Sequence, residues 1–590
     1  RVPPAVGEDR VGRAIKRWVR GATIVVCACL FAGCAKPRST STEPAAIFED
    51  VTRGAGIDFV QDNGFSNRFR FVESNSGGVA VFDYDGDGDQ DLYFVQSGSS
   101  DPAESVRQRP HGALYRNEGT GRFTDITTRS GLDRDLGYGH GVATGDIDND
   151  GFVDLLVTGY RSIHLFRNEG GSGRFADITK DWGLDAIHGT GMAMSAAFCD
   201  FDNDRRLDLY VAYYGNWSHA NDRACADAAG DPEYCTPELI DPDTHRLWRN
   251  TGSKFEDISR RAGIERKRGR GLAVAWLDAD DDGRPDIFVA NDLSPNLLWR
   301  GRGDGTFQDI AVEAGCAFNA DGQIMAGMGV ALGDIDHSGR ESLYVTDFTA
   351  KLNALFVPVG DGLYEDRSRG RGKDLAETVS TLAFGTAFLD YDNDGWLDLV
   401  VNNGHVNYRI DRSPGGWTYK QPKHLFHNRG EGRFESVSRS ALGPLATPMV
   451  GRGLATGDLD NDGRMDVVAV NQNAAPQVLL NRCAGSGHWV GFALEGSTCH
   501  RDAELARVYV TAGGARRSAT VRGGSSYLSA SDRRVLFGLG TATRIDKIEV
   551  RWPDGVREAI DVGKVGIDAY HRIVQGRGLV HCGPGGAARR

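Results

Sequence analysis

The sequence has 590 residues, and its 68 Lys and Arg residues against 81 Asp and Glu residues give a formal charge of −13. With 40% hydrophobic and 25% charged residues it has the composition of a globular protein, which excludes a mainly disordered or transmembrane chain. Its 78 glycines are roughly twice the average usage, which favours short strands and tight turns, and its acidity argues against a general nucleic-acid binder.

The N-terminal segment has the pattern of an export signal. Three basic residues between positions 16 and 20 precede an apolar run over 21–32, which is too short to span a bilayer as a helix. The small residues before Cys34 resemble the cleavage site of a bacterial lipoprotein, in which this cysteine carries the lipid; an ordinary cleaved signal is the alternative. We expect a lipoprotein-type signal peptide over 1–34 and a polar tether over 35–46. The protein would then be an exported bacterial lipoprotein, anchored at the outer membrane or the cell surface.

A nine-residue aspartate motif recurs seven times along the chain, and its copies are called loops one to seven below. The full motif has aspartate at positions one, three, five and nine and glycine at position six. Loop three has Arg205 instead of the glycine, and loop five keeps only Asp334 and Asp336, with Ser338 and Ser342 at positions five and nine. The other six loops keep all four aspartates: Asp83, Asp85, Asp87 and Asp91; Asp146, Asp148, Asp150 and Asp154; Asp200, Asp202, Asp204 and Asp208; Asp278, Asp280, Asp282 and Asp286; Asp390, Asp392, Asp394 and Asp398; and Asp458, Asp460, Asp462 and Asp466.

A unit of four short strands surrounds each motif. A strand of small residues precedes the motif, an apolar strand follows it, and a third and a fourth strand come next, as in GVATGD, DLLVT, HLFRN and RFADIT of the second unit. Repeated four-strand units indicate the blades of a β-propeller. Only six fourth strands follow the seven motifs, and the segment 47–52 matches the missing one. We therefore predict an all-β fold: a seven-bladed β-propeller over 47–482, closed by its N-terminal strand so that no sheet edge is exposed, and then a small C-terminal β domain.

The aspartate loops have the chemistry of a calcium site. Ca²⁺ takes six to eight oxygen ligands in irregular geometry, whereas Zn²⁺ prefers His or Cys. A turn rich in Asp and Gly is the alternative, but turn chemistry does not require the aspartate at position nine. We predict about six calcium ions with a mainly structural role. Loop five should stay empty, with Glu341 at position eight pointing away, and loop three should bind less tightly because Arg205 must adopt a positive φ.

These units resemble FG-GAP or VCBS repeats, which also form the propellers of integrin α-subunits, over about residues 47–482. The segments GGSSYLS, FGLG and VRWPDG resemble the ASPIC/UnbV domain, which follows such repeats in the cartilage acidic protein family and its bacterial relatives. We expect this β domain over 487–562 and a frayed tail over 563–590. The resemblance implies an extracellular role in interaction or cell adhesion.

The cysteines outside the signal include one expected disulfide. Cys225 and Cys235 lie ten residues apart in a polar insertion of the third unit, and export permits a bridge between them. A bridge between Cys483 and Cys499 is an open alternative. Three cysteines stay unassigned: Cys199, Cys316 and Cys582.

The sequence favours a binding protein over an enzyme, since it contains no HExxH, G-x-S-x-G or phosphate-loop motif. In the predicted propeller the variable loops share the face opposite the aspartate loops, where a binding site is expected. The candidate contacts on that face, each alternatively a turn-stabilising residue, are His140, Asn291, Asp292, Asn403, His405, Tyr408, Trp417, Asn471 and Asn473. The expected partner is an extracellular protein or glycan, with no nucleic acid and with membrane contact only through the lipid anchor. The alternative is an enzyme, a lyase or a natural-product biosynthetic protein, with its site in the propeller channel.

Overall fold

The computed structural model describes residues 46–101, 110–185, 191–227, 229–371 and 373–580. The predicted signal peptide, Cys34 and Cys582 lie outside these residues. In the described part of the chain, no helix has the length and hydropathy needed to cross a membrane. Its α-helices have four residues each: α1 (Thr127–Ser130), α2 (Ser259–Ala262) and α3 (Arg439–Leu442). Strands provide the rest of the framework, so the prediction of an all-β protein is confirmed.

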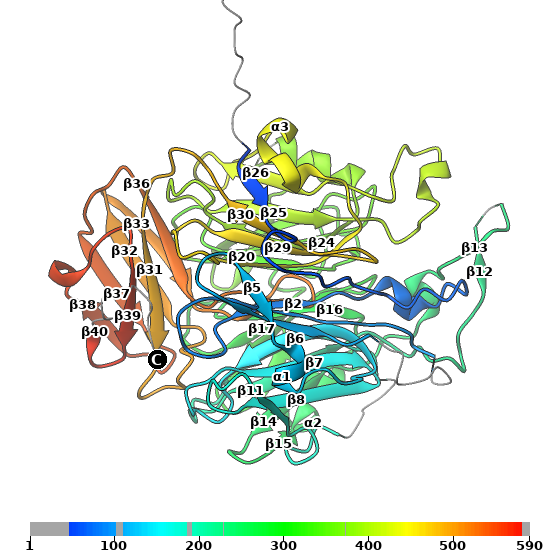
Figure 1. Cartoon of the computed structure of the whole chain (residues 1–590), viewed down its shortest axis with the longest axis horizontal. Helices are drawn as coiled ribbons and strands as arrows, with labels where there is room; N and C mark the ends of the chain where they lie inside the picture. Colours follow the sequence, from blue (N-terminus) through cyan, green and yellow to red (C-terminus); the bar gives the residue numbers. More distant parts are fainter. Residues whose placement is uncertain (1–45, 102–109, 186–190, 228, 372, 581–590) are drawn as a thin grey trace, which may run out of the picture. The chain divides into compact units, whose positions relative to one another are not determined.

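The aspartate loops lie in seven antiparallel sheets, each with four strands from the repeats (Figure 1). Sheets one and two contain β2 (Val79–Phe82), β3 (Asp91–Phe94), β4 (Ala113–Asn117) and β5 (Phe123–Asp125), then β6 (Tyr138–Gly145), β7 (Asp154–Tyr160), β8 (Ser162–Asn168) and β9 (Phe175–Asp177). Sheets three and four contain β10 (Ala193–Cys199), β11 (Asp208–Tyr213), β14 (Arg246–Asn250) and β15 (Phe255–Asp257), then β16 (Gly271–Leu277), β17 (Asp286–Asn291), β18 (Leu297–Gly301) and β19 (Phe307–Asp309).

The remaining three sheets repeat this order. Sheets five and six contain β20 (Val330–Gly333), β21 (Ser342–Val345), β22 (Ala354–Gly360) and β23 (Leu363–Asp366), then β24 (Ala383–Leu389), β25 (Asp398–Asn403), β26 (His424–Asn428) and β27 (Phe434–Ser436). Sheet seven contains β28 (Gly451–Gly457), β29 (Asp466–Asn471), β30 (Gln477–Asn481) and β1 (Phe48–Asp50). In every sheet the aspartate loop joins the first strand to the second.

The N-terminal strand β1 supplies the fourth strand of sheet seven. It runs antiparallel to β30, with Phe48 opposite Asn481 and Asp50 opposite Leu479. Phe48 is only 1% exposed and packs in a cluster that includes Leu425 of sheet six. The predicted pairing of the segment 47–52 with the last repeat strand is therefore confirmed.

Successive sheets share their hydrophobic cores. Sheets one and two share a cluster, and so does each later pair up to sheets six and seven. A further cluster joins sheet seven to sheet one, where Val81 packs with Ala455 and Val468. Close approach explains the small residues of the first strands: a Cβ on Gly145 would lie 3.0 Å from the Phe198 side chain of the next sheet. Each sheet of the repeat region thus shares a core with the sheets before and after it in this series.

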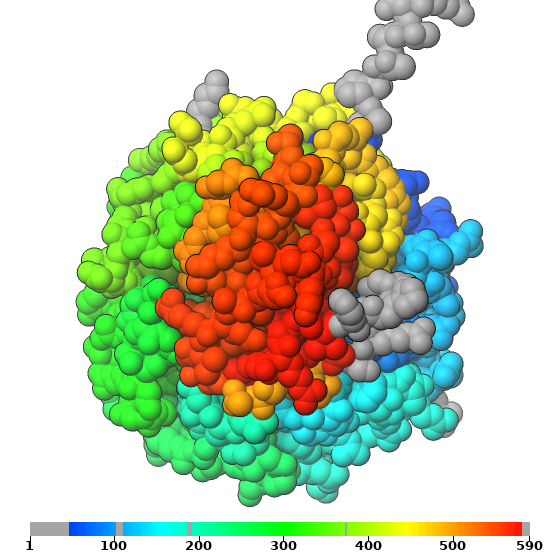
Figure 2. All heavy atoms as spheres, turned by 90° about the vertical axis from the view of Figure 1, so that its left-hand side faces the viewer, coloured from blue at the N-terminus to red at the C-terminus, as the bar shows by residue number. Residues whose placement is uncertain are grey.

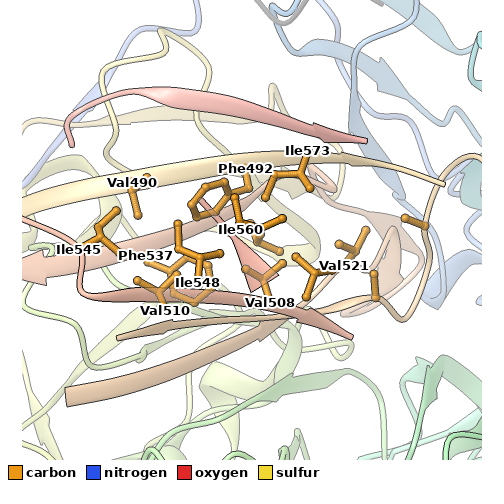
Figure 3. Close-up of a cluster of buried hydrophobic side chains, with 14 of the residues drawn as sticks. Val490, Phe492, Val508, Val510, Val521, Phe537, Ile545, Ile548, Ile560 and Ile573 are labelled. Atoms are coloured by element: carbon orange, nitrogen blue, oxygen red, sulfur yellow. The ribbon is translucent and has the colours of Figure 1, made fainter. Parts of the chain in front are cut away.

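Two sheets form the C-terminal β domain. The first contains β36 (Val535–Gly540), β31 (His488–Glu495), β39 (Tyr570–Val574) and β40 (Gly578–Val580), and the second β33 (Ala515–Thr520), β32 (Arg507–Ala512), β37 (Lys547–Arg551) and β38 (Arg557–Ile560). Between them lies an apolar core in which Val490 and Phe492 of one sheet face Val508 and Ile548 of the other (Figure 3). Figure 2 shows the domain (orange to red) packed against the repeat sheets.

The predicted end of this domain was too early. Residues 563–580, expected to be part of a frayed tail, include β39 and β40, and β39 pairs in parallel with β31. Ile573 of β39 is fully buried in the domain core. The Gly-rich composition of this segment reflects the turn between β39 and β40, where Gly576 has a φ of 73°, and not a lack of structure.

A hairpin of the C-terminal domain reaches the centre of the repeat sheets. Its strands β34 (Gly524–Ser525) and β35 (Ser529–Ala530) extend sheet one, with Ala530 opposite Ala80. Between them, Tyr527 and Leu528 are fully buried in a central cluster of side chains from several sheets. The hairpin also exchanges two backbone hydrogen bonds with Val330 of sheet five. The GGSSYLS segment is thus a strand-and-turn element that packs at the centre of the repeat sheets.

Candidate metal centres in the aspartate loops

Backbone hydrogen bonds give each aspartate loop its shape. In loop two, the Asp146 carboxylate at position one accepts from the backbone N–H groups of Asp150 (3.0 Å) and Gly151 (2.9 Å). Asp154 at position nine accepts from the backbone N–H of Ile147 (2.9 Å) and of Asn168 at the end of the third strand (2.8 Å). The carboxylates at both ends therefore hold the turn closed and direct the carboxylates between them toward a common centre.

Position nine has this bonding in all six loops that keep its aspartate. The residue at position two donates to one oxygen, and the last residue of the third strand donates to the other. In loop three, for example, Asp208 accepts from Phe201 at 3.2 Å and from Asn250 at 2.8 Å. The aspartate at position nine thus links the loop to the first three strands of its sheet. This explains why six of the seven loops retain it.

Asparagines at the ends of the third strands connect neighbouring loops, a role that the sequence analysis missed. The Asn168 side-chain amide donates to the Tyr84 carbonyl of loop one at 2.7 Å, and the Asn117 amide donates to the Leu459 carbonyl of loop seven at 2.7 Å. Asn250, Asn428 and Asn481 make the same kind of bond to loops two, five and six. The signal was the recurrent final Asn of the third strands (LYRN, LFRN, LWRN).

The backbone also shows a second left-handed position in each loop. Arg205 at position six of loop three has a φ of 71°, as predicted. Position four also has a positive φ in every loop, and the sequence analysis missed this. The residues there are Gly86, Asn149, Asn203, Asp281, His337, Asn393 and Asn461, and the prevalence of Asn and Gly was the available signal.

Several carboxylate oxygens in the loops have no hydrogen-bond partner although they are buried. One oxygen is unpaired at position three in loops three, four, six and seven, on Asp202, Asp280, Asp392 and Asp460. Within single loops, three acidic groups such as Asp83, Asp85 and Asp91 place ligand atoms within 4.8 Å of one another. Buried anionic oxygens without donors are costly, and this donor set of hard oxygens fits a calcium ion.

The pKa values of these carboxyls also show that their ionised forms are unfavourable without a cation. Burial raises the pKa of Asp286 to about 8, against two backbone donors, and nearby Asp280 and Asp278 add to the rise. Burial raises the pKa of Asp462 to about 7, and the adjacent Asp460 carboxylate contributes. A divalent cation at the centre of the loop would offset both causes by favouring the ionised carboxylates.

Arginine side chains neutralise part of the carboxylate charge in loops three, four and seven. Arg249 contacts Asp202 of loop three at 2.6 Å, and Arg482 contacts Asp460 of loop seven at 2.7 Å. Arg551 of the C-terminal domain contacts Asp278 of loop four at 2.7 Å. The loops therefore differ in electrostatics although their aspartates are the same.

Loop five serves as a contact with the C-terminal domain. Glu341 points away from the loop, as predicted, and its carboxylate accepts from both terminal nitrogens of Arg522 at 2.9 and 3.2 Å. Burial alone would raise the pKa of Glu341, but Arg522 and Arg507 lower it to about 2. Asp334 at position one accepts from the Ser518 hydroxyl at 2.6 Å. Loop five also lacks the carboxylates at positions five and nine. This lack, together with the contacts of Glu341 and Asp334, agrees with a loop that does not bind calcium.

The predicted ligand face needs a correction. Six of its candidates are buried, and all of them except Asp292 bond to the backbone: His140, Asn291, Asp292, Asn403, His405 and Asn471. Asn291, for instance, donates to the Pro295 carbonyl at 2.8 Å, and Asn403 to the Pro422 carbonyl at 2.8 Å. The exposed Asn473 accepts from the Asn63 backbone N–H at 3.0 Å. His140 lies in the first strand β6, and the other residues end second strands or begin the following loops. The six buried residues therefore offer little surface to a ligand.

Tyr408, also a candidate, belongs to a partly exposed group of rings that we call the aromatic cluster: Phe65, Phe69, Tyr234 and Tyr408. Phe69 and Tyr408 stack with ring centroids 5.5 Å apart, and Phe65 and Tyr408 are 42% and 39% exposed. The Arg409 guanidinium lies 4.7 Å from the Tyr408 ring centroid. Phe69 has a φ of 55°, a strained conformation for an aromatic residue.

The aromatic cluster lies on the face predicted to carry the binding site. Tyr408 lies between the second and third strands of sheet six, and Tyr234 follows β13 in the corresponding insertion of sheet three. That insertion contains the short strands β12 (Cys225–Ala226) and β13 (Pro232–Glu233), which lie across the repeat sheets from the C-terminal strands (Figure 1).

The predicted disulfide between Cys225 and Cys235 is formed in this insertion. Cys483 and Cys499 are both free thiols, so the alternative bridge between them is absent. Cys199 and Cys316 are buried free thiols.

Comparisons with known proteins agree with the repeat architecture. A model of the FG-GAP-like repeat matches residues 83–157, 146–211, 278–345 and 390–469, which together contain all seven loops. A model named ASPIC and UnbV matches residues 496–579, which include β39. This chain combines FG-GAP-like repeats with an ASPIC/UnbV domain. Human cartilage acidic protein 1 is 25% identical over 481 residues, which cover 70% of this chain and 69% of the human protein. The Xenopus tropicalis protein of the same name is also 25% identical, with 70% of each chain covered.

Solved structures similar to this chain include two lectins. One is an Agrocybe aegerita lectin that recognises non-reducing terminal N-acetylglucosamine, with 14% identity, a TM-score of 0.38, and coverage of 68% of this chain and 86% of the lectin. The other is the BP39L lectin from Burkholderia pseudomallei, with 11% identity, a TM-score of 0.40, and coverage of 69% and 96%. Both TM-scores are low, so neither likeness bears on what this chain binds.

Proposed function

We propose that this protein is a calcium-stabilised, seven-bladed β-propeller that binds an extracellular protein or carbohydrate partner through the aromatic cluster. The protein would be exported and held at the cell surface by a lipid on Cys34, and its role would be adhesion or interaction rather than catalysis. The observation that carries the binding proposal is an aromatic cluster on the face opposite the aspartate loops, in which Phe65 and Tyr408 are exposed and Tyr408 stacks on the buried, strained Phe69.

Closure of the propeller by β1 is supported by the cycle of shared cores. Each sheet packs on the next, and sheet seven packs on sheet one. The pairing of β1 with β30 joins the first repeat residues to the last sheet, as a ring closure requires.

Calcium stabilisation is supported by the crowded carboxylates and their unpaired oxygens. The pKa values yield a pH prediction. The Asp286 pKa is about 8 in the metal-free fold, above the value near 3.9 of an unfolded Asp, so the folded state holds more protons between these two values. Metal-free protein should therefore gain stability as the pH falls from 8 toward 5, while protons displace calcium. We expect the rise in melting temperature caused by calcium to shrink steadily from pH 8 to pH 6, as measured by calorimetry with calcium and with chelator. A calcium effect that is constant over this range would contradict the assignment.

Binding at the aromatic cluster is supported by its chemistry. Exposed ring faces stack on sugar rings and on apolar peptide side chains, and aromatic residues dominate binding energy at interfaces. Asp231, 3.6 Å from Arg409, places a charged pair beside the rings. Such a combination of flat apolar faces and fixed polar groups suits a specific ligand more than a nonspecific apolar contact.

The binding prediction is tested by a thermal-shift screen of glycans and extracellular proteins, followed by titration of each hit. Replacing Tyr408 with Ala should weaken binding of a genuine ligand at least about tenfold, since loss of an interface aromatic commonly costs more than 1 kcal/mol. Val556→Ala is the matched control, because Val556 is an exposed apolar residue of the C-terminal domain, at 48% exposure. A ligand whose affinity is unchanged by Tyr408→Ala and by Phe65→Ala would refute this site.

The alternative function, a lyase or a natural-product biosynthetic enzyme with its site in the channel, requires space at the centre of the repeat sheets. There, Tyr527 and Leu528 pack with Phe71 and Val72 in one buried cluster. Among the candidates, Asp292 most resembles a catalytic acid, since burial raises its pKa to about 6. Its side chain, however, is only 9% exposed and accepts a hydrogen bond from the Tyr214 hydroxyl at 2.5 Å. These observations favour the binding function.

A further inference from the structure

Loop six differs from the other loops in having an imidazole beside its carboxylates. The third strands of sheets one to three carry Arg116, Arg167 and Arg249 directly before their final Asn, and β26 carries His427 at this place. The following Asn428 donates its backbone N–H to Asp398 at 2.7 Å, as the equivalent asparagines do in those sheets. The substitution therefore places a nitrogen ligand at the same point of an otherwise conventional aspartate loop.

The His427 ring faces three carboxylates of loop six. Its Nδ1 atom lies 3.3 Å from Asp398 Oδ1 and 3.6 Å from Asp392 Oδ2, and its Nε2 atom lies 3.8 Å from Asp394 Oδ2. His427 is only 8% exposed, and its Nδ1 atom has no hydrogen-bond partner. The Oδ1 atom of Asp392 is also buried and without a partner. A buried ring nitrogen and a buried carboxylate oxygen thus face the same centre unsatisfied.

From this arrangement we infer that loop six binds a borderline divalent ion of the zinc and cobalt class, with His427 as a ligand, in preference to calcium. Asp392, Asp394 and His427 offer ligand atoms that lie within 4.8 Å of one another. Imidazole nitrogen is a good ligand for Zn²⁺ and Co²⁺ and a poor one for Ca²⁺, which takes oxygen ligands. Ligand atoms about 2.0–2.1 Å from a tetrahedral zinc lie about 3.4 Å apart, close to the separations of Nδ1 from Asp392 and Asp398.

A simpler role for His427 is that of a fixed counterion, like Arg249 in loop three. The two residues differ in their contacts: Arg249 donates hydrogen bonds to Asp202 at 2.6 Å and Asp204 at 2.9 Å, whereas Nδ1 of His427 lies 3.3 Å from Asp398, a contact that raises the His427 pKa without an aligned hydrogen bond. An imidazole nitrogen can carry a lone pair and ligate a metal ion, whereas a guanidinium cannot. The inference rests on the proposed function in one respect, namely that the aspartate loops hold divalent ions.

The test is a calorimetric titration of Zn²⁺ into the full chain in excess calcium, with calcium release measured in parallel. We expect one zinc per chain with release of one calcium, and cobalt in place of zinc should show the visible absorption of a site with nitrogen ligation. His427→Arg, which installs the residue of sheets one to three, and His427→Gln should each weaken zinc binding at least a hundredfold. Their calcium binding at the other loops should be unchanged.

The control variant is His488→Gln, which removes a second imidazole close to a carboxylate, that of Asp568 at 2.8 Å, on the exposed surface. It should keep the zinc site; loss of the site in this variant, or its retention in both His427 variants, would overturn the inference. If the His427 variants fail to fold, anomalous scattering at the zinc edge from wild-type crystals decides, since the ion must lie in loop six. Calcium binding without any zinc site refutes this inference alone, whereas binding of neither ion refutes the proposed function.

Discussion

Chelation of calcium is expected to lower the melting temperature of the protein by on the order of 10 °C. A ligand that binds only the folded state adds about 2.7 kcal/mol when its concentration is a hundred times its Kd, and six loops would contribute together. The physical origin is the repulsion between carboxylates such as Asp458 and Asp466, which are both buried in loop seven. Scanning calorimetry with calcium and with excess chelator measures the effect directly.

Single-loop variants separate this effect from general damage. Asp150→Ala removes the position-five ligand of loop two and should lower the melting temperature in calcium but much less in chelator. Ser338→Ala changes the same position of loop five, which lacks two of the four carboxylates, and should leave the calcium response intact. Equal effects of Asp150→Ala in both conditions would mean that Asp150 contributes to the turn and not to a metal site.

Replacing Phe48 with Ala should destabilise the protein by roughly 3–5 kcal/mol, the usual cost of removing a fully buried aromatic side chain. Phe48 is 1% exposed and anchors β1 between sheets six and seven. Loss of this anchor frees the edge of β30 and weakens the contact that joins the two ends of the repeat region. Denaturant unfolding followed by tryptophan fluorescence gives the difference in free energy.

The matched control for the strand closure is Glu49→Ala. Glu49 is the next residue of β1 but is exposed, and its contact with Arg482 at 3.1 Å is a surface ion pair. Such pairs contribute about 0–1 kcal/mol, so this variant should unfold almost as the wild type does. If Phe48→Ala costs no more than Glu49→Ala, β1 does not hold the ring closed.

The sequence predicted those features that repeat locally. Aspartate positions and strand alternation recur in each unit, and this pattern located the loops and the sheets. The one unit without its own fourth strand located the partner of the segment 47–52. The positive φ of Arg205 followed in the same way from its place in the motif. The repeat marks these features in the order of residues, including the distant pairing of β1 with β30.

Contacts between distant segments that the repeat does not mark were not predictable in this way. Asn291 and Asn403 are polar residues of a type that usually lies on the surface, but packing of neighbouring sheets buries them. The insertion of Tyr527 into the centre of the sheets joins residues hundreds of positions apart, and no periodic pattern reports it. The proposed metal-binding role of His427 was not predictable, because only the fold places its imidazole beside three carboxylates of loop six.

The most direct test of the account is the number of calcium ions bound per chain, measured by equilibrium dialysis with calcium as the sole divalent cation. Six loops keep four carboxylates, and loop five keeps two, so about six ions per chain are expected at saturation. Seven tightly bound ions would contradict the assignment of loop five alone. One ion or none would contradict the metal assignment as a whole, and with it the proposal that calcium stabilises the fold.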